Sequence, residues 1–260
     1  MFFGGRSPWG DVRRTRGADL RYDLTISLED VVKGISREIQ VPRIEPCSIC
    51  GGTGARKGTR TRTCPSCNGS GQIQQIQQSG FARLIRVQPC NNCRGRGTII
   101  DSPCEECGGE RRLERTRKIR INIPAGIESG ERLRLTREGD TPDAGGPPGD
   151  LYVVVNVRPH EIFERDGPDI HCTIPIGFAE AALGAKIEVP TIESSAMLDI
   201  PSGTQTGTLF RMRGKGLPIL HDGDGRGDEF VRIIVRTPTD LTEEQKRLIK
   251  EFDEQEKTKS

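Results

Sequence analysis

The octapeptide CSICGGTG at residues 47–54 sets two cysteines two positions apart and follows them with a Gly-x-Gly. The pattern recurs as CPSCNGSG at residues 64–71 and as CNNCRGRG at residues 90–97. A fourth copy, CEECGGER at residues 104–111, has Arg111 in place of the last glycine. Two thiolates at this spacing can occupy one edge of a tetrahedral zinc site, and the glycines allow a tight backbone around the metal. The four pairs therefore predict two closed, structural zinc sites per chain.

The segment between the second and third pairs indicates how the pairs share their metals. It is long enough for an antiparallel hairpin of about residues 72–78 against 84–88, which would bring its own ends together. Strands at 38–41 and 118–123 could pair at the base of this hairpin and hold the outer pairs together. Serial pairing, of the first pair with the second and the third with the fourth, remains open from spacing alone. The nested arrangement assigns one zinc to Cys47, Cys50, Cys104 and Cys107, and the other to Cys64, Cys67, Cys90 and Cys93.

Disulfides and redox chemistry are the alternative uses of these cysteines. The chain opens without a hydrophobic signal segment and has no long apolar run, so we expect a cytoplasmic location with no membrane partner. A reducing compartment favours metal over disulfides, and a redox Cys-x-x-Cys site usually needs only one pair beside a helix. The ninth cysteine, Cys172, lies in the alternating stretch 170–176 and is predicted to be a small buried core residue.

An internal repeat organises the rest of the chain. IPAGIESG at 123–130 recurs as IPSGTQTG at 200–207, and GDLYV at 149–153 recurs as GDEFV at 227–231. A repeat of this kind fixes the domain map, and here it indicates two copies of one domain, the first interrupted by the cysteines. Low aromatic content, 4%, together with 32 glycines and 17 prolines favours short strands and turns over a helical bundle.

Local patterns place the elements of the two copies. Alternating strands are predicted at 22–28 and 118–123, and more buried strands at 151–157 and 230–235. Short helices are predicted at 28–33 and 178–183, each followed by a glycine, and the sequence TEEQ at 242–245 is a capping box that opens a C-terminal helix. The fold class is thus mainly β, with two tandem, similar, β-sandwich-like domains, an inserted two-zinc hairpin module in the first, and a C-terminal helix. The predicted boundaries are a linker remnant at 1–16, a first β-domain at 17–46 and 112–160, a zinc module at 47–111, a second β-domain at 161–239, and a C-terminal helix and tail at 240–260.

Charge and motifs bear on the classes of function. The net charge is +2, so no global field indicates nucleic acid. Basic residues do flank the cysteine pairs, and a solvated surface is favoured there over a nucleic-acid patch. No nucleotide-binding loop, nucleophile elbow or paired carboxylates indicate an enzyme. The flanking basic residues are Arg56, Lys57, Arg60 and Arg62, and then Arg111, Arg112, Arg115, Arg117 and Lys118.

Four cysteine knuckles inserted in a duplicated β-domain resemble the zinc-containing subclass of the DnaJ-type J-domain co-chaperones. The stretches FAEAALGA at 178–185, IEVP at 187–190 and TQTGTLFRMRGKG at 204–216 are similar to the bacterial and archaeal members. The family's J-domain and its His-Pro-Asp motif are absent from this sequence, whereas FFGGRSPWG at 2–10 looks like the end of its Gly/Phe-rich linker. The resemblance therefore implies a non-enzymatic chaperone module that does not stimulate a partner's ATPase.

The resemblance also implies partners and site residues. Such a module would bind unfolded polypeptides, prevent their aggregation and deliver them to a DnaK-type chaperone, the second zinc site taking part in delivery. A homodimer would form through the C-terminal helix, although its apolar stripe could equally pack on its own domain. Zinc-dependent thiol–disulfide exchange and zinc-ribbon nucleic-acid binding remain the alternative functions. The implied client groove consists of Leu20, Ile39, Val41, Ile119 and Val153, which could instead be ordinary core residues, and the implied dimer contact consists of Leu248, Ile249 and Phe252.

Overall fold

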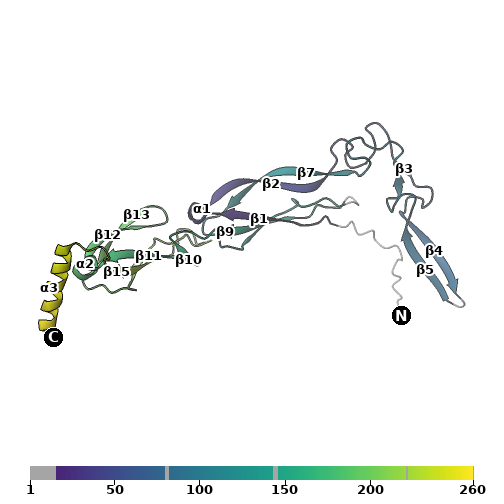
Figure 1. The fold of residues 1–260 in the computed structure, drawn as a ribbon. Helices are drawn as coiled ribbons and strands as arrows, with labels where there is room; N and C mark the ends of the chain where they lie inside the picture. The colour runs from purple at the N-terminus through teal and green to yellow at the C-terminus, as the bar shows by residue number, and fades with distance from the viewer. Residues whose placement is uncertain (1–15, 80–81, 143–145, 221, 260) are drawn as a thin grey trace, which may run out of the picture. The chain divides into compact units, whose positions relative to one another are not determined.

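The computed structural model describes residues 16–79, 82–142, 146–220 and 222–259 (Figure 1). The predicted linker remnant lies outside these residues, apart from Arg16. The described residues form fifteen strands and three helices, which confirms the mainly β fold class. No helix in this part of the chain is long and apolar enough to cross a membrane.

The chain forms two compact units that do not follow the repeat. One unit comprises Met1–Leu24, Glu38–Ile121 and Arg132–Val154, and the other comprises Thr25–Arg37, Asn122–Glu131 and Val155–Ser260. The domain boundaries that we derived from the repeat and the cysteines therefore stay a prediction.

Both copies of the repeat build the same three-stranded sheet. In the first copy the strand order is β1-β9-β8, and in the second it is β11-β15-β14, with the short β10 added at the edge of β11. β11 and β15 run parallel, with Ile170 opposite Glu229 and Gly177 opposite Arg236. The bounds are β1 (Leu20–Ile26), β8 (Arg132–Leu135), β9 (Leu151–Val157), β10 (Glu164–Asp166), β11 (Asp169–Gly177), β14 (Leu209–Met212) and β15 (Glu229–Arg236).

A two-stranded ribbon accompanies the three-stranded sheet in each copy. In the second copy it is β12 (Ala185–Pro190) with β13 (Ser195–Ile200), closed by a short turn. In the first copy it is β2 (Ile35–Pro46) with β7 (Arg112–Ile123), and each strand is twice as long, 12 residues against 6. The longer ribbon leads into the cysteine region, so the insertion sits at the end of a ribbon that the second copy simply closes (Figure 1).

The two short helices begin and end where the sequence predicts, and the C-terminal helix begins where its capping box predicts. α1 (Leu28–Lys33) starts at Ser27, whose hydroxyl accepts the N–H of Asp30, and it stops at Gly34. The predicted strand at 22–28 therefore ends earlier, at Ile26, because Ser27 and Leu28 are used to start the helix. The other two are α2 (Phe178–Leu183), which stops at Gly184, and α3 (Glu243–Lys259), which begins with the capping box of Thr242 and Gln245.

The core lies under the central strands, as their β-branched sequences indicate. Leu151, Val153 and Val155 of β9 are fully buried, as are Val231 and Ile233 of β15. Alternation along these strands puts every second side chain into the core. Cys172 of β11 is also buried, which confirms its predicted place in the core of the second copy.

The cysteine region contains two small two-stranded sheets. β4 (Gln72–Ser79) and β5 (Ala82–Pro89) form the predicted hairpin, in register from Gln72 opposite Pro89 to Ser79 opposite Ala82. β3 (Arg62–Thr63) pairs with β6 (Thr98–Ile99) at the base of that hairpin. These short ladders bring the knuckles together in pairs.

Candidate metal centres and binding surface

The eight knuckle cysteines gather into two groups of four. One group is Cys47, Cys50, Cys104 and Cys107, and the other is Cys64, Cys67, Cys90 and Cys93, with all sulfur atoms in a group within 4.8 Å of one another. This is the nested arrangement that the hairpin predicts. We refer to these groups as site 1 and site 2, respectively.

The sulfur spacing fits a tetrahedral metal. Between the two knuckles of site 1 the Sγ–Sγ distances are 3.9 Å for Cys47–Cys104 and 3.8 Å for Cys50–Cys107. In site 2 the Sγ–Sγ distances are 3.8 Å for Cys64–Cys90 and 3.7 Å for Cys67–Cys93. Four sulfurs at the zinc–thiolate distance of about 2.3 Å define a tetrahedron with edges of about 3.8 Å, whereas a disulfide needs about 2.05 Å. Each site can therefore hold one metal ion with four thiolates, and this geometry excludes disulfides between the two knuckles of a site.

Backbone N–H groups point at the sulfurs and fix the knuckles. The N–H groups of Gly54, Gly71 and Gly97 donate to the second cysteine of their own knuckles at 3.2 to 3.3 Å. All three glycines have positive φ, near 75°, a conformation that L-residues with side chains rarely adopt. The Gly-x-Gly that follows the first three cysteine pairs thus supplies the donors that stabilise a thiolate.

The two knuckles of a site also exchange backbone hydrogen bonds. In site 2, the N–H of Cys90 donates to Gly71 O at 2.8 Å and the N–H of Cys64 donates to Gly97 O at 2.9 Å. Site 1 repeats the exchange, with Cys104 donating to Gly54 O and Cys47 donating to the carbonyl of Arg111. The residue at the last position of each motif therefore joins its knuckle to the partner knuckle.

The thiols of each site have very different affinities for protons. Burial is the largest influence on Cys50 and Cys67 and opposes their ionisation, but hydrogen bonds from backbone N–H groups, chiefly of Gly54 and Gly71, and from the neighbouring thiols together lower their pKa values to about 7. Burial, together with the neighbouring thiols, raises the pKa of Cys107 to about 11. Four adjacent thiols cannot all ionise without a counter-charge, so binding a cation would displace their protons.

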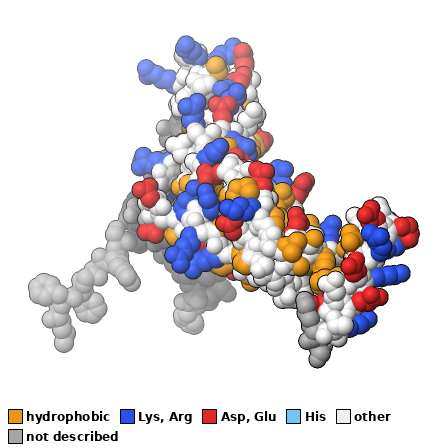
Figure 2. Space-filling model, turned by 90° about the vertical axis from the view of Figure 1, so that its left-hand side faces the viewer, with side chains coloured by type: hydrophobic (Ala, Val, Ile, Leu, Met, Phe, Trp, Pro, Cys, Tyr) orange, Lys and Arg blue, Asp and Glu red, His pale blue; other side chains and the backbone are white. Residues whose placement is uncertain are grey.

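Carboxylates pair with much of the basic charge around the metal sites. Arg56 contacts Glu105 at 2.5 Å, and Arg62 forms a two-pronged pair with Asp101 at 2.7 Å. Arg115 contacts Glu106 at 3.2 Å. On the face shown in Figure 2, acidic and basic side chains are interspersed. This pairing weakens the nucleic-acid alternative, because phosphate binding requires unpaired Lys and Arg.

The five residues of the implied client groove differ in exposure. Ile39 and Val41 of β2 and Val153 of β9 are buried, at 3% exposure or less. Leu20 of β1 and Ile119 of β7 are half-buried. The buried three are core residues of the chain itself, so only Leu20 and Ile119 offer apolar surface directly, and the binding role of the set stays a prediction.

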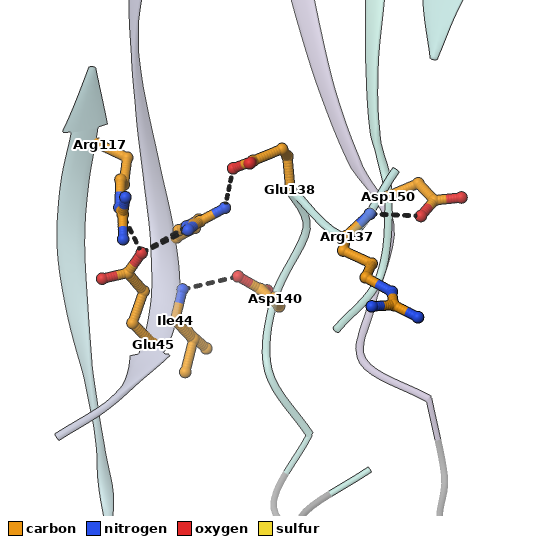
Figure 3. Close-up of polar contacts among 8 residues, drawn as sticks. Ile44, Glu45, Arg117, Arg137, Glu138, Asp140 and Asp150 are labelled. Atoms are coloured by element: carbon orange, nitrogen blue, oxygen red, sulfur yellow. Dashed lines mark hydrogen bonds and ion pairs between the residues drawn. The ribbon is translucent and has the colours of Figure 1, made fainter. Parts of the chain in front are cut away.

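An ion-pair network, which the sequence reasoning missed, holds the extended end of the β2–β7 ribbon (Figure 3). Arg43 of β2 is about one-tenth exposed and contacts Glu138 as well as Glu45, to which Arg117 of β7 also donates at 2.9 Å. Ile44 N donates to the Asp140 carboxylate at 2.7 Å. The segment after β8 is thereby fixed to the ribbon beyond the point where the second copy's ribbon ends.

A second polar cluster is present in both copies. Asp150 accepts the N–H of Arg137 at 2.9 Å and the side chain of Arg134, while its own N–H donates to Asp19. In the second copy, Asp228 makes the corresponding bonds to Gly214, Arg211 and Asp169. The Arg137 N–H holds the pKa of Asp150 at about 2, with Arg16 and Arg134 acting against burial in the same direction.

The three implied dimer residues lie on one exposed face of α3. Leu248, Ile249 and Phe252 are 43 to 53% exposed, and the Phe252 ring meets Phe178 of α2 edge-on at 6.3 Å. They line a mostly apolar groove of about 680 Å³ together with Pro175 and Ile176 of β11 and residues of α2 and the segment before α3. The stripe thus contacts its own domain and still leaves apolar surface open.

Comparison with known proteins supports the resemblance drawn from the motifs. A family model described as DnaJ C terminal domain matches residues 20–238. The protein named Chaperone protein DnaJ from Halalkalibacterium halodurans is 46% identical over 257 residues, which cover 97% of this chain and 68% of that protein. Proteins of the same name from Shouchella clausii and Methanothermobacter thermautotrophicus are 48% and 44% identical, covering 97% and 96% of this chain.

The chain spans about two thirds of the length of these relatives, 65 to 68%. The matched region includes both copies of the repeat and both cysteine sites. By its duplicated β-fold, its knuckles and its relatives, this chain belongs to the DnaJ chaperone family.

Proposed function

We propose that this chain binds unfolded polypeptides, keeps them from aggregating and delivers them to a DnaK-type chaperone, acting in the cytoplasm without ATP. Membership of the DnaJ chaperone family carries the proposal. Direct client binding, delivery and cellular location go beyond that membership and are parts of the proposal.

The β2–β7 ribbon supports a specific way of binding. Among the described strands β2 pairs with β7 alone, and its other edge is covered by the segment after β8 only at Ile44, which bonds to Asp140 and Thr141. An extended client could add to this edge as a further strand. Half-buried Ile119 and Leu20 would then take up apolar client side chains, while buried Ile39 and Val41 support the ribbon from beneath.

The test is suppression of aggregation by the zinc-loaded chain without ATP. A chemically denatured reporter is diluted into buffer, and light scattering is compared for the parent and for Ile119→Ser with Leu20→Ser. Serine at these half-buried positions removes apolar contact, and it does not place a charge in the core. Each lost aliphatic contact is expected to weaken binding roughly tenfold, since fully burying such a side chain contributes about 1.5–3 kcal/mol.

A matched control comes from the second copy. Met197 of β13 is an exposed apolar residue on the corresponding ribbon, and Met197→Ser should leave suppression unchanged. Loss of suppression in Met197→Ser alone would place client binding in the second copy. A parent chain that fails to suppress aggregation at all would reject the proposal.

We also infer that sites 1 and 2 each hold one zinc ion. Eight thiolates in two closed four-sulfur sets suit zinc, and such sites are structural. Elemental analysis of the purified chain should find two zinc ions per chain. Cys47→Ser with Cys104→Ser should leave one, and retention of both ions would contradict the site 1 assignment.

The groove beside α3 supports a homodimer as the third part of the proposal. Its apolar lining and the exposed side chains of Leu248 and Phe252 would be covered by the same face of a second copy. Light scattering coupled to size exclusion should give about twice the chain mass, and Leu248→Ser with Phe252→Ser should give the monomer. A monomeric parent at micromolar concentration would refute this part.

A further inference from the structure

Arg111 departs from the knuckle motif and yet keeps its backbone conformation. Its φ is 72°, within a few degrees of the 76°, 72° and 74° of Gly54, Gly71 and Gly97 at the same position of the other knuckles. A residue with a side chain is disfavoured in this region, so the arginine is held there at a cost in stability. Such a cost calls for a compensating contact of the side chain.

Site 1 has room for this side chain, whereas site 2 has none. A Cβ built on Gly71 would lie 2.4 Å from Gly95 O, and one built on Gly97 would lie 2.3 Å from Gly69 O. In site 1 the Arg111 side chain passes directly over Gly54, where a built Cβ would lie 2.9 Å from Arg111 Cγ. The two sites are therefore similar in their sulfurs and different in this one contact.

The Arg111 side chain reaches the other metal site. Its Nη2 donates to Thr98 Oγ1 at 2.8 Å, and Thr98 follows Gly97 directly and pairs with Thr63 beside the knuckles of site 2. Its buried Nε has no hydrogen-bond partner among the described residues, so Thr98 is the main polar contact of this side chain. The Arg111 contact thus crosses from site 1 to site 2.

A second arginine makes the reciprocal crossing. Arg96 belongs to the third knuckle, in site 2, and its Nη1 donates to Gly109 O of the fourth knuckle at 3.4 Å. Its Nη2 contacts the Glu110 carboxylate at 3.3 Å. Together the two arginines join the last knuckle of site 1 to the last knuckle of site 2 from both directions.

We propose that Arg111 and Arg96 form a latch that couples the two metal sites, so that a metal in site 2 slows the loss of the metal from site 1. When site 2 is empty, its knuckles lose the backbone geometry that places Thr98. Arg111 then loses its acceptor while its strained backbone remains, and site 1 is weakened. The latch depends on metal binding and on these contacts, and it does not depend on client binding.

The experiment compares zinc release from site 1 with site 2 intact and with site 2 disabled by Cys64→Ser. Excess chelator with a colorimetric zinc reporter gives the release rate, and Cys47→Ser assigns the phases to the sites. In the parent background we expect Cys64→Ser to speed release from site 1 on the order of tenfold, a coupling of about 1.4 kcal/mol. In Arg111→Gly, which restores the motif glycine, the same change should alter the rate less than twofold.

Two further variants protect the interpretation. Thr98→Val removes the acceptor without touching a knuckle, and it should uncouple the sites as Arg111→Gly does, even if the glycine variant folds poorly. Arg94→Gly is the matched control, because Arg94 also has positive φ, 53°, and its side chain is exposed. It should retain the tenfold coupling.

A structural readout separates the latch from a general loss of stability. Hydrogen exchange at the β3–β6 ladder should quicken when site 1 is disabled by Cys47→Ser in the parent, and it should not respond in Arg111→Gly. Equal coupling in the parent and in Arg111→Gly, or no coupling in the parent, would overturn the proposal. Loss of coupling in Arg94→Gly would attribute it to backbone conformation and would equally overturn it.

Discussion

Replacing Glu229 with leucine should stabilise the second copy of the repeat. Glu229 lies in the central strand β15 and is completely buried, with Oε1 3.3 Å from Cys172 Sγ and Oε2 without a partner among the described residues. The first copy has Leu151 at the corresponding position of β9, also completely buried. The repeat therefore shows that this position accommodates leucine.

The size of the effect follows from the unpaired oxygen. A buried polar group without a hydrogen bond costs about 1–3 kcal/mol, and replacing both members of a weak polar pair with apolar groups removes that cost. Leucine is somewhat bulkier than glutamate, but Leu151 fills the corresponding fully buried position of the first copy, so we expect little overpacking. We expect a gain of about 1–3 kcal/mol at a pH where Glu229 is protonated.

The gain should increase with pH. Burial raises the pKa of Glu229, and the Cys172 thiol and Lys215 offset this in part. The folded chain thus binds a proton that the unfolded chain releases above about pH 4.3, the ordinary glutamate pKa. The parent is therefore most stable below that pH, and its free energy of unfolding falls as the pH rises toward the folded-state pKa of Glu229, by at most about 1.4 kcal/mol per pH unit. Glu229→Leu lacks this loss.

Hydrogen exchange measured by mass spectrometry on peptides of β11 and β15 tests both statements. At one pH, exchange should be about 5- to 150-fold slower in the variant, which corresponds to 1–3 kcal/mol. Peptides of β1 and β9 report on the first copy, and Glu164→Leu, an exposed glutamate of the same sheet, is the matched control. Faster exchange in Glu229→Leu, or a difference that does not grow from pH 5 to pH 8, would refute the reasoning.

Four more outcomes follow from the described contacts. Gly71→Ala should reduce the zinc content from two ions per chain to one, because the new Cβ would lie 2.4 Å from Gly95 O. Gly58→Ala is the control: its Cβ would have nothing within 4 Å, so the variant should keep both ions and lose only roughly 1 kcal/mol of stability. Arg43→Met should destabilise the first copy by about 1–3 kcal/mol, since the partly exposed carboxylates of Glu45 and Glu138 lose their partner. Faster hydrogen exchange at the Ile44 and Thr141 amides would show this loss. The ionised Asp150 carboxylate stabilises the fold above about pH 4, and this stabilisation should be lost as the pH falls toward its pKa of about 2. Asp150→Asn should be less stable at neutral pH. Its acid unfolding, followed by circular dichroism, should lack that part of the transition. Removing metal with a chelator should expose the Gly54, Gly71 and Gly97 amides to exchange while leaving the β11–β15 ladder protected, and loss of both together would contradict a metal role confined to the knuckles.

The sequence predicted the structure correctly wherever neighbouring residues in the chain determine it. The segment between the second and third cysteine pairs has the length of a hairpin, and the ladder from Gln72 to Pro89 forms as expected. The ends of the short helices follow from Gly34 and Gly184, which adopt positive φ. The hairpin follows from segment length, and the helix ends follow from glycine, which adopts positive φ at little cost, so no distant contact is needed.

The extension of β2 and β7 was not predictable from the sequence. Charged residues such as Arg43, Glu45 and Arg117 interrupt the apolar alternation there, so the pattern ends before the strands do. What holds this end of the ribbon is the contact of Arg43 with Glu138, which is remote in sequence and carries no local signal. For the same reason, alternation could not tell that Val41 is buried whereas Ile119 is half-exposed.

The two copies of the repeat separate what the fold requires from what the insertion requires. Asp150 and Asp228 make the same bonds in both copies, so that cluster serves the shared sheet. In the second copy Glu193 and Lys215 stand at the positions of Arg43 and Glu138, Glu193 pairs with Arg226 instead, and the ribbon closes at once. The Arg43 network therefore belongs to the insertion: it stiffens a ribbon that has to carry the metal sites beyond its sheet. Arg111 adds a further contact within the cysteine region, where its Nη2 joins the fourth knuckle to Thr98 beside site 2.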